Sequence, residues 1–320
     1  MPVPVRDRHP VFLKGRVESL CPTLPDREGV LLVRNCYCVK IFRMKSKNSP
    51  IGIFDSGYGG LTIFENIRRL LPDYDYIYLG DNARTPYGPR SFEIVYQFTR
   101  QAVMKLFDEG CPLVILACNT ASAKALRTIQ QNDLPVSEDP SRRVLGVIRP
   151  TVEALGSLSR TRHVGILGTV GTITSCSYSM EIEKLFPEMT VTGEACPMWV
   201  PLVENREYDN NGADYFVQKN LNNIFVSDSQ IDTLVLGCTH YPLLESKIRK
   251  YLPEGVSLLS QGPYVAESLK SYLLRHPEMS GRLSKNGSCR FITTEAEEKF
   301  SETASLFLKH FVDVERIVIN

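Results

Sequence analysis

Short apolar runs alternate with longer amphipathic stretches from residue 51 to the end of the sequence. A short apolar run bounded by turn residues is typical of a strand that is buried on both faces. Strands are therefore predicted at residues 51–54, 76–79, 113–117, 143–147, 163–167, 190–194, 233–237 and 257–259. Helices are predicted from the amphipathic stretches at residues 61–71, 91–109, 121–132, 177–186, 214–226, 242–251, 264–275 and 295–308. This alternation indicates βαβ units, and hence parallel sheets with helices on both faces.

One sequence pattern occurs twice along the chain. Residues 113–120 and 233–240 are each an apolar run that ends in a small residue, followed by a cysteine and polar residues. Residues 51–60 and 164–173 are each a strand, a glycine-rich polar turn and the start of a helix. A glycine turn followed by a cysteine turn therefore occurs twice. We predict an α/β protein with two similar doubly wound parallel-sheet domains that face each other across a cleft.

The domain bounds follow from the repeat. The join is predicted in the polar, proline-containing stretch 137–142. Residues 49–142, together with about 253–320, are expected to form the first domain, and residues 143–252 the second. Because ligands bind at the carboxyl ends of parallel strands, both cysteine turns are expected to face the cleft.

The N-terminal 48 residues differ from the rest of the chain. Prolines at positions 2, 4, 10, 22 and 25 are interleaved with Arg and Asp, without a clear period. We expect residues 1–48 to be disordered or a non-native extension. One hypothesis is that translation starts at Met44, which native peptides from residues 1–43 in a mass spectrum would contradict. The alternative is a regulatory extension.

Composition narrows the classes of ligand. Lys+Arg number 37 and Asp+Glu 36, a net charge of +1, which argues against nucleic acid as the main ligand. No apolar run reaches the roughly 18 to 20 residues that span a bilayer, and no signal peptide begins the chain, so a cytoplasmic protein is predicted. The nine cysteines have no framework spacing, which favours reduced thiols.

Fingerprints for metals and cofactors are missing from the sequence. There is no CxxC or HExxH spacing, no GxGxxG with a downstream acid and no GxxxxGK[ST]. Cys36 and Cys38 are too close together for a metal site. Nothing singles out a Schiff-base lysine, and Lys124 is expected to face solvent. We therefore expect neither a metal nor a cofactor.

Cys118 and Cys238 are the candidate reactive groups. A cysteine between a strand and a helix has its thiolate favoured by the helix dipole and nearby amides. The same amides can hold a carboxylate, with help from the hydroxyls of Thr120 and Thr239. A cysteine can also be buried as a small hydrophobic residue without any reactivity. This alternative is preferred for Cys111, Cys176, Cys196 and Cys289.

Other polar residues lie close to these turns. Asp55 closes an apolar strand and could relay a thiol proton, although a turn or helix-cap role is the alternative. The segment 81–88 follows the second strand and could line the same cleft through Tyr87 and Gly88. His240 could act as a general acid or hold a substrate carboxylate.

These motifs resemble the glutamate racemase branch of the aspartate/glutamate racemase family. The resemblance runs from about Pro50 to the C-terminal helices, and residues 51–57, 81–88, 118–122 and 237–242 carry it. It implies two facing α/β domains, and an isomerase that interconverts L- and D-glutamate for peptidoglycan without a cofactor. Residues 1–44 have no counterpart in the family core. The insert at residues 137–143 is longer than usual.

The resemblance also implies the roles of individual residues. Cys118 and Cys238 would be the two acid/base thiols, assisted by Asp55, Glu204 and His240. Cys238 would deprotonate L-glutamate, and Cys118 would deprotonate D-glutamate. The implied substrate contacts are Asp55, Ser56, Pro86, Tyr87, Gly88, Asn119, Thr120, Thr169, Thr172, Thr239 and His240. A homodimer is expected from the family.

Three rival functions remain open at this stage. A racemase acting on aspartate would use the same fold, but the segments after Cys118 and Cys238 resemble the glutamate branch. A hydrolase or transferase with one nucleophilic thiol would leave the second motif without a role. A regulatory second role, such as restraining enzymes of DNA topology, finds no basic patch to support it.

Overall fold

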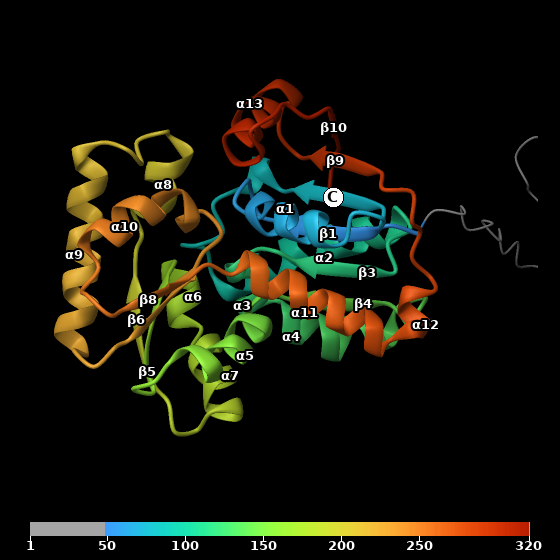
Figure 1. Cartoon of the computed structure of the whole chain (residues 1–320). Helices are drawn as coiled ribbons and strands as arrows, with labels where there is room; N and C mark the ends of the chain where they lie inside the picture. The colour runs from blue at the N-terminus through green and yellow to red at the C-terminus, as the bar shows by residue number, and fades with distance from the viewer. Residues whose placement is uncertain (1–48, 320) are drawn as a thin grey trace, which may run out of the picture. The chain divides into compact units, whose positions relative to one another are not determined.

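The computed structural model describes residues 49–319. The predictions for residues 1–48, including disorder and a start at Met44, fall outside this range. Two parallel sheets form the framework (Figure 1). Within residues 49–319 no helix is long and apolar enough to cross a bilayer. The predicted fold class, with two parallel-sheet α/β units, is confirmed.

The first sheet has six parallel strands in the order β10-β9-β2-β1-β3-β4. Their bounds are Val314–Arg316 (β10), Cys289–Thr293 (β9), Tyr76–Gly80 (β2), Ile51–Asp55 (β1), Leu113–Leu116 (β3) and Arg143–Gly146 (β4). Figure 1 shows β9, from near the C-terminus, lying beside β2. The chain therefore returns to its first sheet after building the second.

The second sheet has four parallel strands in the order β6-β5-β7-β8. Their bounds are Thr190–Ala195 (β6), His163–Gly168 (β5), Thr233–Gly237 (β7) and Ser257–Leu259 (β8). β1 and β7, which precede a glycine turn and a cysteine turn respectively, are buried along their whole length. Apolar residues on both faces suit strands covered by helices on either side.

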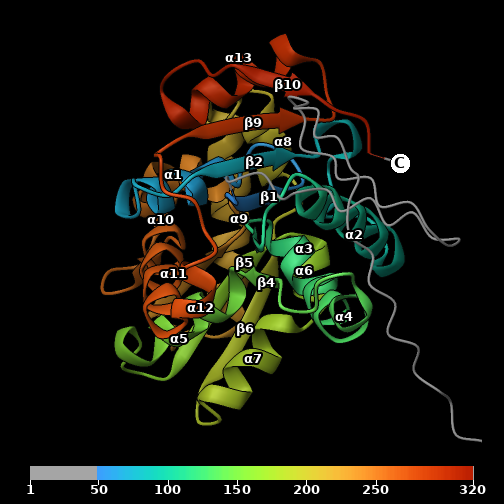
Figure 2. The same cartoon turned by 90° about the vertical axis from the view of Figure 1, so that its right-hand side faces the viewer.

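Helices cover both faces of each sheet. Their bounds are Leu61–Leu70 (α1), Phe92–Asp108 (α2), Asn119–Lys124 (α3), Leu126–Thr128 (α4), Ile148–Leu158 (α5), Val170–Thr174 (α6), Ser177–Leu185 (α7), Trp199–Glu204 (α8), Asn211–Ser227 (α9), Glu245–Tyr251 (α10), Gly262–Arg275 (α11), Pro277–Ser280 (α12) and Glu297–Leu308 (α13). On the first sheet, α1, α11 and α13 share one apolar cluster, and α2 covers the other face (Figure 2). On the second sheet, α8, α9 and α10 lie on one face and α5 and α7 on the other.

All eight predicted strands are present, with bounds that agree within one residue. Most predicted helices are also present, but the stretch 121–132 divides into α3, α4 and a π-helical turn at Ile129–Asp133. The sequence reasoning missed β9, β10, α5, α6, α8 and α12. Several of these have six residues or fewer, and α5 contains Pro150 and Gly156, which mask its helical pattern.

Strand pairing puts both joins between the sheets at other positions than expected. β4 pairs with β3 of the first sheet, although residue 143 was expected to open the second domain. β8 pairs with β7 of the second sheet, although residues from about 253 were expected in the first. The sequence of a short apolar strand does not indicate which sheet the strand joins, because strand pairing depends on long-range contacts.

Candidate active site

Cys118 lies between the end of β3 and the first turn of α3. It is the N-cap residue of this helix, and its Sγ accepts a hydrogen bond from the Ala121 amide at 3.4 Å. The Ser56 Oγ, which follows β1, lies 3.3 Å from the same sulfur. Burial and the Asp55 carboxylate raise the pKa of the Cys118 thiol to about 12. The hydrogen bonds from Ser56 and from the Ala121 amide at the helix start lower the pKa as expected, but burial and Asp55 outweigh them.

Asp55 ends β1 beneath the Cys118 thiol. Its side chain is buried, and the Gly57 amide donates to Oδ2 at 2.9 Å. Among residues 49–319, no hydrogen-bond partner is found for Oδ1. Burial raises the pKa of Asp55, although the charge of His240 partly opposes this effect. Asp55 is thus a buried carboxyl group whose protonated form is favoured by burial, while the backbone amides of Gly57 and Gly60 oppose this effect.

Cys238 follows β7 and has different neighbours. The chain continues into a 3₁₀ turn, Tyr241–Leu244, and α10 begins only at Glu245, so Cys238 is not the N-cap of an α-helix as Cys118 is. His240 Nδ1 lies 3.8 Å from the Cys238 Sγ, and Nε2 lies 3.1 Å from the Glu204 Oε1. Burial lowers the pKa of His240, but the hydrogen bonds to Cys238 and Glu204 outweigh it and raise the pKa to about 10. His240 is therefore protonated at neutral pH.

Both thiols open into one cavity of about 170 Å³. Its lining combines the segment after β2 with both cysteine turns and the glycine turn after β5. The lining residues that the sequence predicted are Ser56, Pro86, Tyr87, Gly88, Cys118, Asn119, Thr120, Thr169, Cys238, Thr239 and His240. The predicted residues Asp55, Thr172 and Glu204 do not line the cavity. Each interacts with a residue that does: Thr172 and Glu204 form hydrogen bonds with Thr120 and His240, and the charge of Asp55 acts on Cys118.

Hydroxyl groups join the two cysteine-bearing halves at the cavity wall. Thr120 of α3 lies 2.9 Å from Thr169 and 3.4 Å from Thr172, measured between their Oγ1 atoms. Thr169 is the N-cap of α6 and accepts from the Thr172 amide. The predicted pair of threonines thus forms a contact between segments 49 and 52 residues apart in the sequence.

The Asn119 side chain is held from behind by a buried polar network. Its Nδ2 donates to Gln261 at 2.6 Å, and the Tyr178 hydroxyl donates to its Oδ1 at 2.7 Å. Gln261 Nε2 in turn lies 2.8 Å from Thr151 and from Tyr178. These four side chains are buried and come from α3, α5, α7 and the residue before α11. The network fixes the amide orientation of Asn119 at the cavity.

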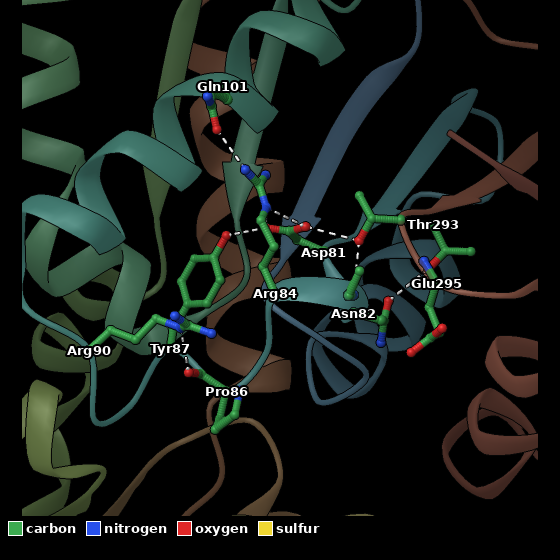
Figure 3. Close-up of polar contacts among 11 residues, drawn as sticks. Asp81, Asn82, Arg84, Pro86, Tyr87, Arg90, Gln101, Thr293 and Glu295 are labelled. Carbon is green, nitrogen blue, oxygen red and sulfur yellow. Dashed lines mark hydrogen bonds and ion pairs between the residues drawn. The ribbon is translucent and has the colours of Figure 1, made fainter. Parts of the chain in front are cut away.

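The segment after β2 is anchored through Asp81 (Figure 3). The Tyr87 hydroxyl donates to Asp81, whose two oxygens also accept from Arg84 Nε at 2.8 and 2.9 Å. Arg84 continues to the Gln101 side chain at 2.6 Å. Since the Tyr87 hydroxyl is directed to Asp81, Tyr87 offers the cavity its ring and backbone. Asp81 is therefore an anchor for the segment.

Sequence reasoning missed several lining residues: Thr85, Pro89, Val170, Cys196, Pro197, Val200 and Pro201. Thr85, Pro89 and Val170 adjoin predicted residues, which is a usable signal. No sequence signal marked the lining residues between Cys196 and Pro201, because they follow β6, a strand without a cysteine turn or a glycine turn. Of the cysteines expected to be buried, Cys111 and Cys196 are buried, Cys289 is half-buried and Cys176 is exposed. Cys176 lies in a left-handed turn before α7, with a φ of 54°, and its side chain is exposed.

Lys124 does not face solvent as expected. It is partly buried, and its Nζ donates to the Arg90 carbonyl at 2.6 Å. The expectation failed because the loop that covers this end of α3 comes from residues more than 30 positions earlier. A larger cavity of about 690 Å³ also touches Lys124, but neither Cys118 nor Cys238 lines it. We therefore place the chemistry in the smaller cavity.

Comparison with known proteins identifies the family. The model of the Asp/Glu/hydantoin racemases matches residues 52–268. The chain belongs to this family. A glutamate racemase of Ruegeria sp. is 39% identical over 275 residues, covering 83% of this chain and 98% of the relative. A glutamate racemase of Shouchella clausii is 39% identical, covering 82% and 92%.

Solved structures of family members have the same fold. Glutamate racemase isoform RacE1 from Bacillus anthracis superposes with a TM-score of 0.77 at 36% identity, covering 86% of this chain and 99% of its own. The Francisella tularensis glutamate racemase, in complex with D-glutamate, has a TM-score of 0.76 at 32% identity over the same shares. The resemblance seen in the sequence motifs is thus confirmed.

Proposed function

We propose that this protein is a glutamate racemase that interconverts L- and D-glutamate through two acid/base thiols, without a cofactor. The observation that carries the proposal is one small cavity with two cysteines, each beside a different proton-handling group. Relatives that are 37–40% identical over most of their length are glutamate racemases. Inverting a carbon centre needs one base and one acid on opposite faces, which a pair of thiols supplies.

In the direction from L- to D-glutamate, Cys238 would be the base. The charged imidazole of His240, which Glu204 holds, would stabilise Cys238 as a thiolate before L-glutamate binds. The thiolate removes the Cα proton, and the Cys118 thiol donates its own proton to the opposite face. Its raised pKa keeps Cys118 protonated before the reaction. The turnover leaves a Cys118 thiolate and a Cys238 thiol.

The return reaction uses the same groups in reverse. When D-glutamate binds the resting form instead, in which Cys118 is a thiol, Cys118 must first lose its proton to an acceptor. We infer that Asp55 takes it, because its Oδ1 has no partner in the described part of the chain and its raised pKa brings it closer to that of a thiol. Cys238, supported by His240, then returns a proton to the L face. Asp55 on one side and the His240–Glu204 pair on the other therefore assist the two thiols.

Substrate carboxylates would be held by neutral donors. The cavity offers the hydroxyls of Ser56, Thr120, Thr169 and Thr239, together with the amides at the start of α3. Backbone amides at a helix N-terminus suit an anion. We include in the same proposal, on the family resemblance, a cytoplasmic role in supplying D-glutamate for peptidoglycan, a homodimer, and two domains around the two sheets.

The decisive experiment follows optical activity with two substrates. Purified protein is incubated with L-glutamate or L-aspartate, and the circular dichroism signal is recorded over time. Loss of signal with glutamate, at a much higher kcat/KM than with aspartate, is the expected result. A faster loss with aspartate would assign the chain to the aspartate racemases. In D₂O, deuterium must enter at Cα, whereas a thiol hydrolase would leave Cα unlabelled.

A further inference from the structure

Lys124 is a charged side chain that the proposed chemistry does not use. It is the last residue of α3, the helix that begins with Cys118 at its N-cap. Burial lowers the pKa of Lys124. In the described part of the chain Lys124 forms no ion pair, and its ammonium group donates to the Arg90 carbonyl at 2.6 Å. Partial burial of a cation without a carboxylate partner costs free energy, and the hydrogen bond to Arg90 offsets part of this cost.

Arg90 ends the segment 86–90, which supplies Pro86, Tyr87, Gly88 and Pro89 to the cavity. Figure 3 shows how the first sheet holds this segment, through Tyr87 and Asp81. The Arg90 Nε also folds back to the Pro86 carbonyl at 3.1 Å. These contacts fix the start of the segment. The end of the segment needs a second attachment.

That second attachment is to α6. The side chain of Lys124, at the end of α3, reaches the same place. The Gly171 amide donates to the Gly88 carbonyl at 2.8 Å, which ties the segment to the second sheet's glycine turn. A Cβ on Gly171 would lie 2.6 Å from the Gly88 oxygen and 3.0 Å from the Lys124 Nζ. Only glycine therefore lets these three groups meet. Lys124 spans from the helix of Cys118 to the point where the substrate segment meets α6.

We propose that Lys124 is a positioning residue that holds residues 86–90 against α6 and so keeps the substrate cavity formed. It acts through the Arg90 carbonyl and does not touch the reacting carbon. One short helix thus carries a thiol at its first turn and the clamp of the cavity wall at its last. The proposal rests on the proposed function only where it predicts kinetics; the clamp itself is a property of the unliganded protein.

The direct test is amide hydrogen exchange on the full chain without ligand. Lys124→Met removes the donor and keeps the aliphatic stem. A charge-assisted hydrogen bond stabilises the closed segment, and its loss makes local opening more frequent. The exchange rate of the Gly171 amide should therefore rise on the order of tenfold. The Ala117 amide, which bonds to Phe54 within the first sheet, should not change. Equal rises at both amides would show a general loss of stability and overturn the proposal, as would an unchanged Gly171.

Lys184→Met is the matched control, because Lys184 is an exposed lysine that lines the same larger cavity as Lys124. It should leave exchange at Gly171 and the kinetics unchanged. For Lys124→Met, KM for L- and D-glutamate should rise several-fold while kcat changes less, and Lys124→Arg should restore part of the loss. Altered exchange with unaltered KM would overturn the role in substrate positioning. If the wild-type protein does not racemise glutamate, the proposed function fails, and the exchange result still decides the clamp.

Discussion

At the scale of residues, the two thiols are equivalent in position and different in surroundings. Burial and the charge of Asp55 raise the pKa of Cys118 and favour its protonated form, although the hydrogen bond with Ser56 lowers the pKa. Cys238 faces a protonated His240 that Glu204 holds in place. Enantiomers present their Cα proton to opposite sides of one cavity. Under the proposed mechanism, a thiol on one side and a stabilised thiolate on the other would prepare the resting protein for the L enantiomer.

Replacing either thiol tests this pairing. Cys118→Ser and Cys238→Ser should each lower kcat by about 10²- to 10⁴-fold, because a hydroxyl is a far weaker acid than a thiol and general acid–base catalysis is worth that much. Initial rates from circular dichroism give the measurement in both directions. Cys176→Ser, at an exposed position outside the cavity, is the control and should retain full activity. A variant at 118 or 238 with normal rates would favour a single-nucleophile enzyme.

The His240–Glu204 pair predicts how stability depends on pH. The pKa of His240 rises from 6.5 to about 10 on folding. A raised pKa means that the contribution of the charged imidazole is complete below pH 6.5 and is lost as the pH rises through about 10. Urea unfolding at several pH values should therefore show the free energy of unfolding of the wild type falling towards that of Glu204→Gln. Parallel curves for the two proteins would refute the assignment.

At the scale of elements, turns and helix starts bring the functional groups together. The glycine turn after β1 packs against the cysteine turn after β7, so closely that a Cβ on Gly59 would lie 2.4 Å from Thr239 Oγ1 and 2.5 Å from His240 Nδ1. Thr62 of α1 reinforces this contact by donating to the Thr239 carbonyl at 3.1 Å. The positions of Thr239 and His240 thus depend on a turn about 180 residues earlier.

Gly59→Ala tests this contact between turns. The added methyl group must displace the His240 ring, so kcat should fall by at least tenfold, whereas the lost backbone freedom of glycine by itself changes stability by only about 0.5–1 kcal/mol. Racemisation assays and thermal unfolding on the same sample separate the two effects. Gly212→Ala, where the nearest atom is the Asn210 side chain at 3.1 Å, is the matched substitution and should keep its activity. Normal activity of Gly59→Ala would show that the turn can shift freely.

At the scale of the whole molecule, buried polar groups join the two sheets. The Asn119, Gln261, Tyr178 and Thr151 network draws its members from α3, α5, α7 and the start of α11. A buried network whose members are all paired fixes one arrangement, because each unpaired group would be costly. It therefore fixes the geometry of the cavity as well as stabilising the fold.

Removing one hydroxyl of this network should lower the free energy of unfolding by a measurable amount. Tyr178→Phe removes the 2.7 Å donor of Asn119 Oδ1 and leaves only the Gln261 amide at 3.3 Å, so the free energy of unfolding should fall by about 1 kcal/mol, the typical contribution of one buried hydrogen bond. Urea denaturation monitored by fluorescence gives the value. Tyr215→Phe, at a position that is 61% exposed, should change it little. Equal stability of the Tyr178 variant and the wild type would show that water replaces the hydroxyl.

The sequence alone predicted β1 to β8, most helices and the two cysteine turns, because hydrophobic period and turn chemistry act over a few neighbouring residues. The repeated order of turns also predicted that Cys118 and Cys238 lie at corresponding strand ends.

Only the tertiary structure decided which sheet β4, β8 and β9 join, that Lys124 is enclosed by the segment 86–90, and that the pKa of Cys118 rises. These properties depend on desolvation and on contacts between segments tens to hundreds of residues apart. Local sequence periodicity carries no information about such contacts.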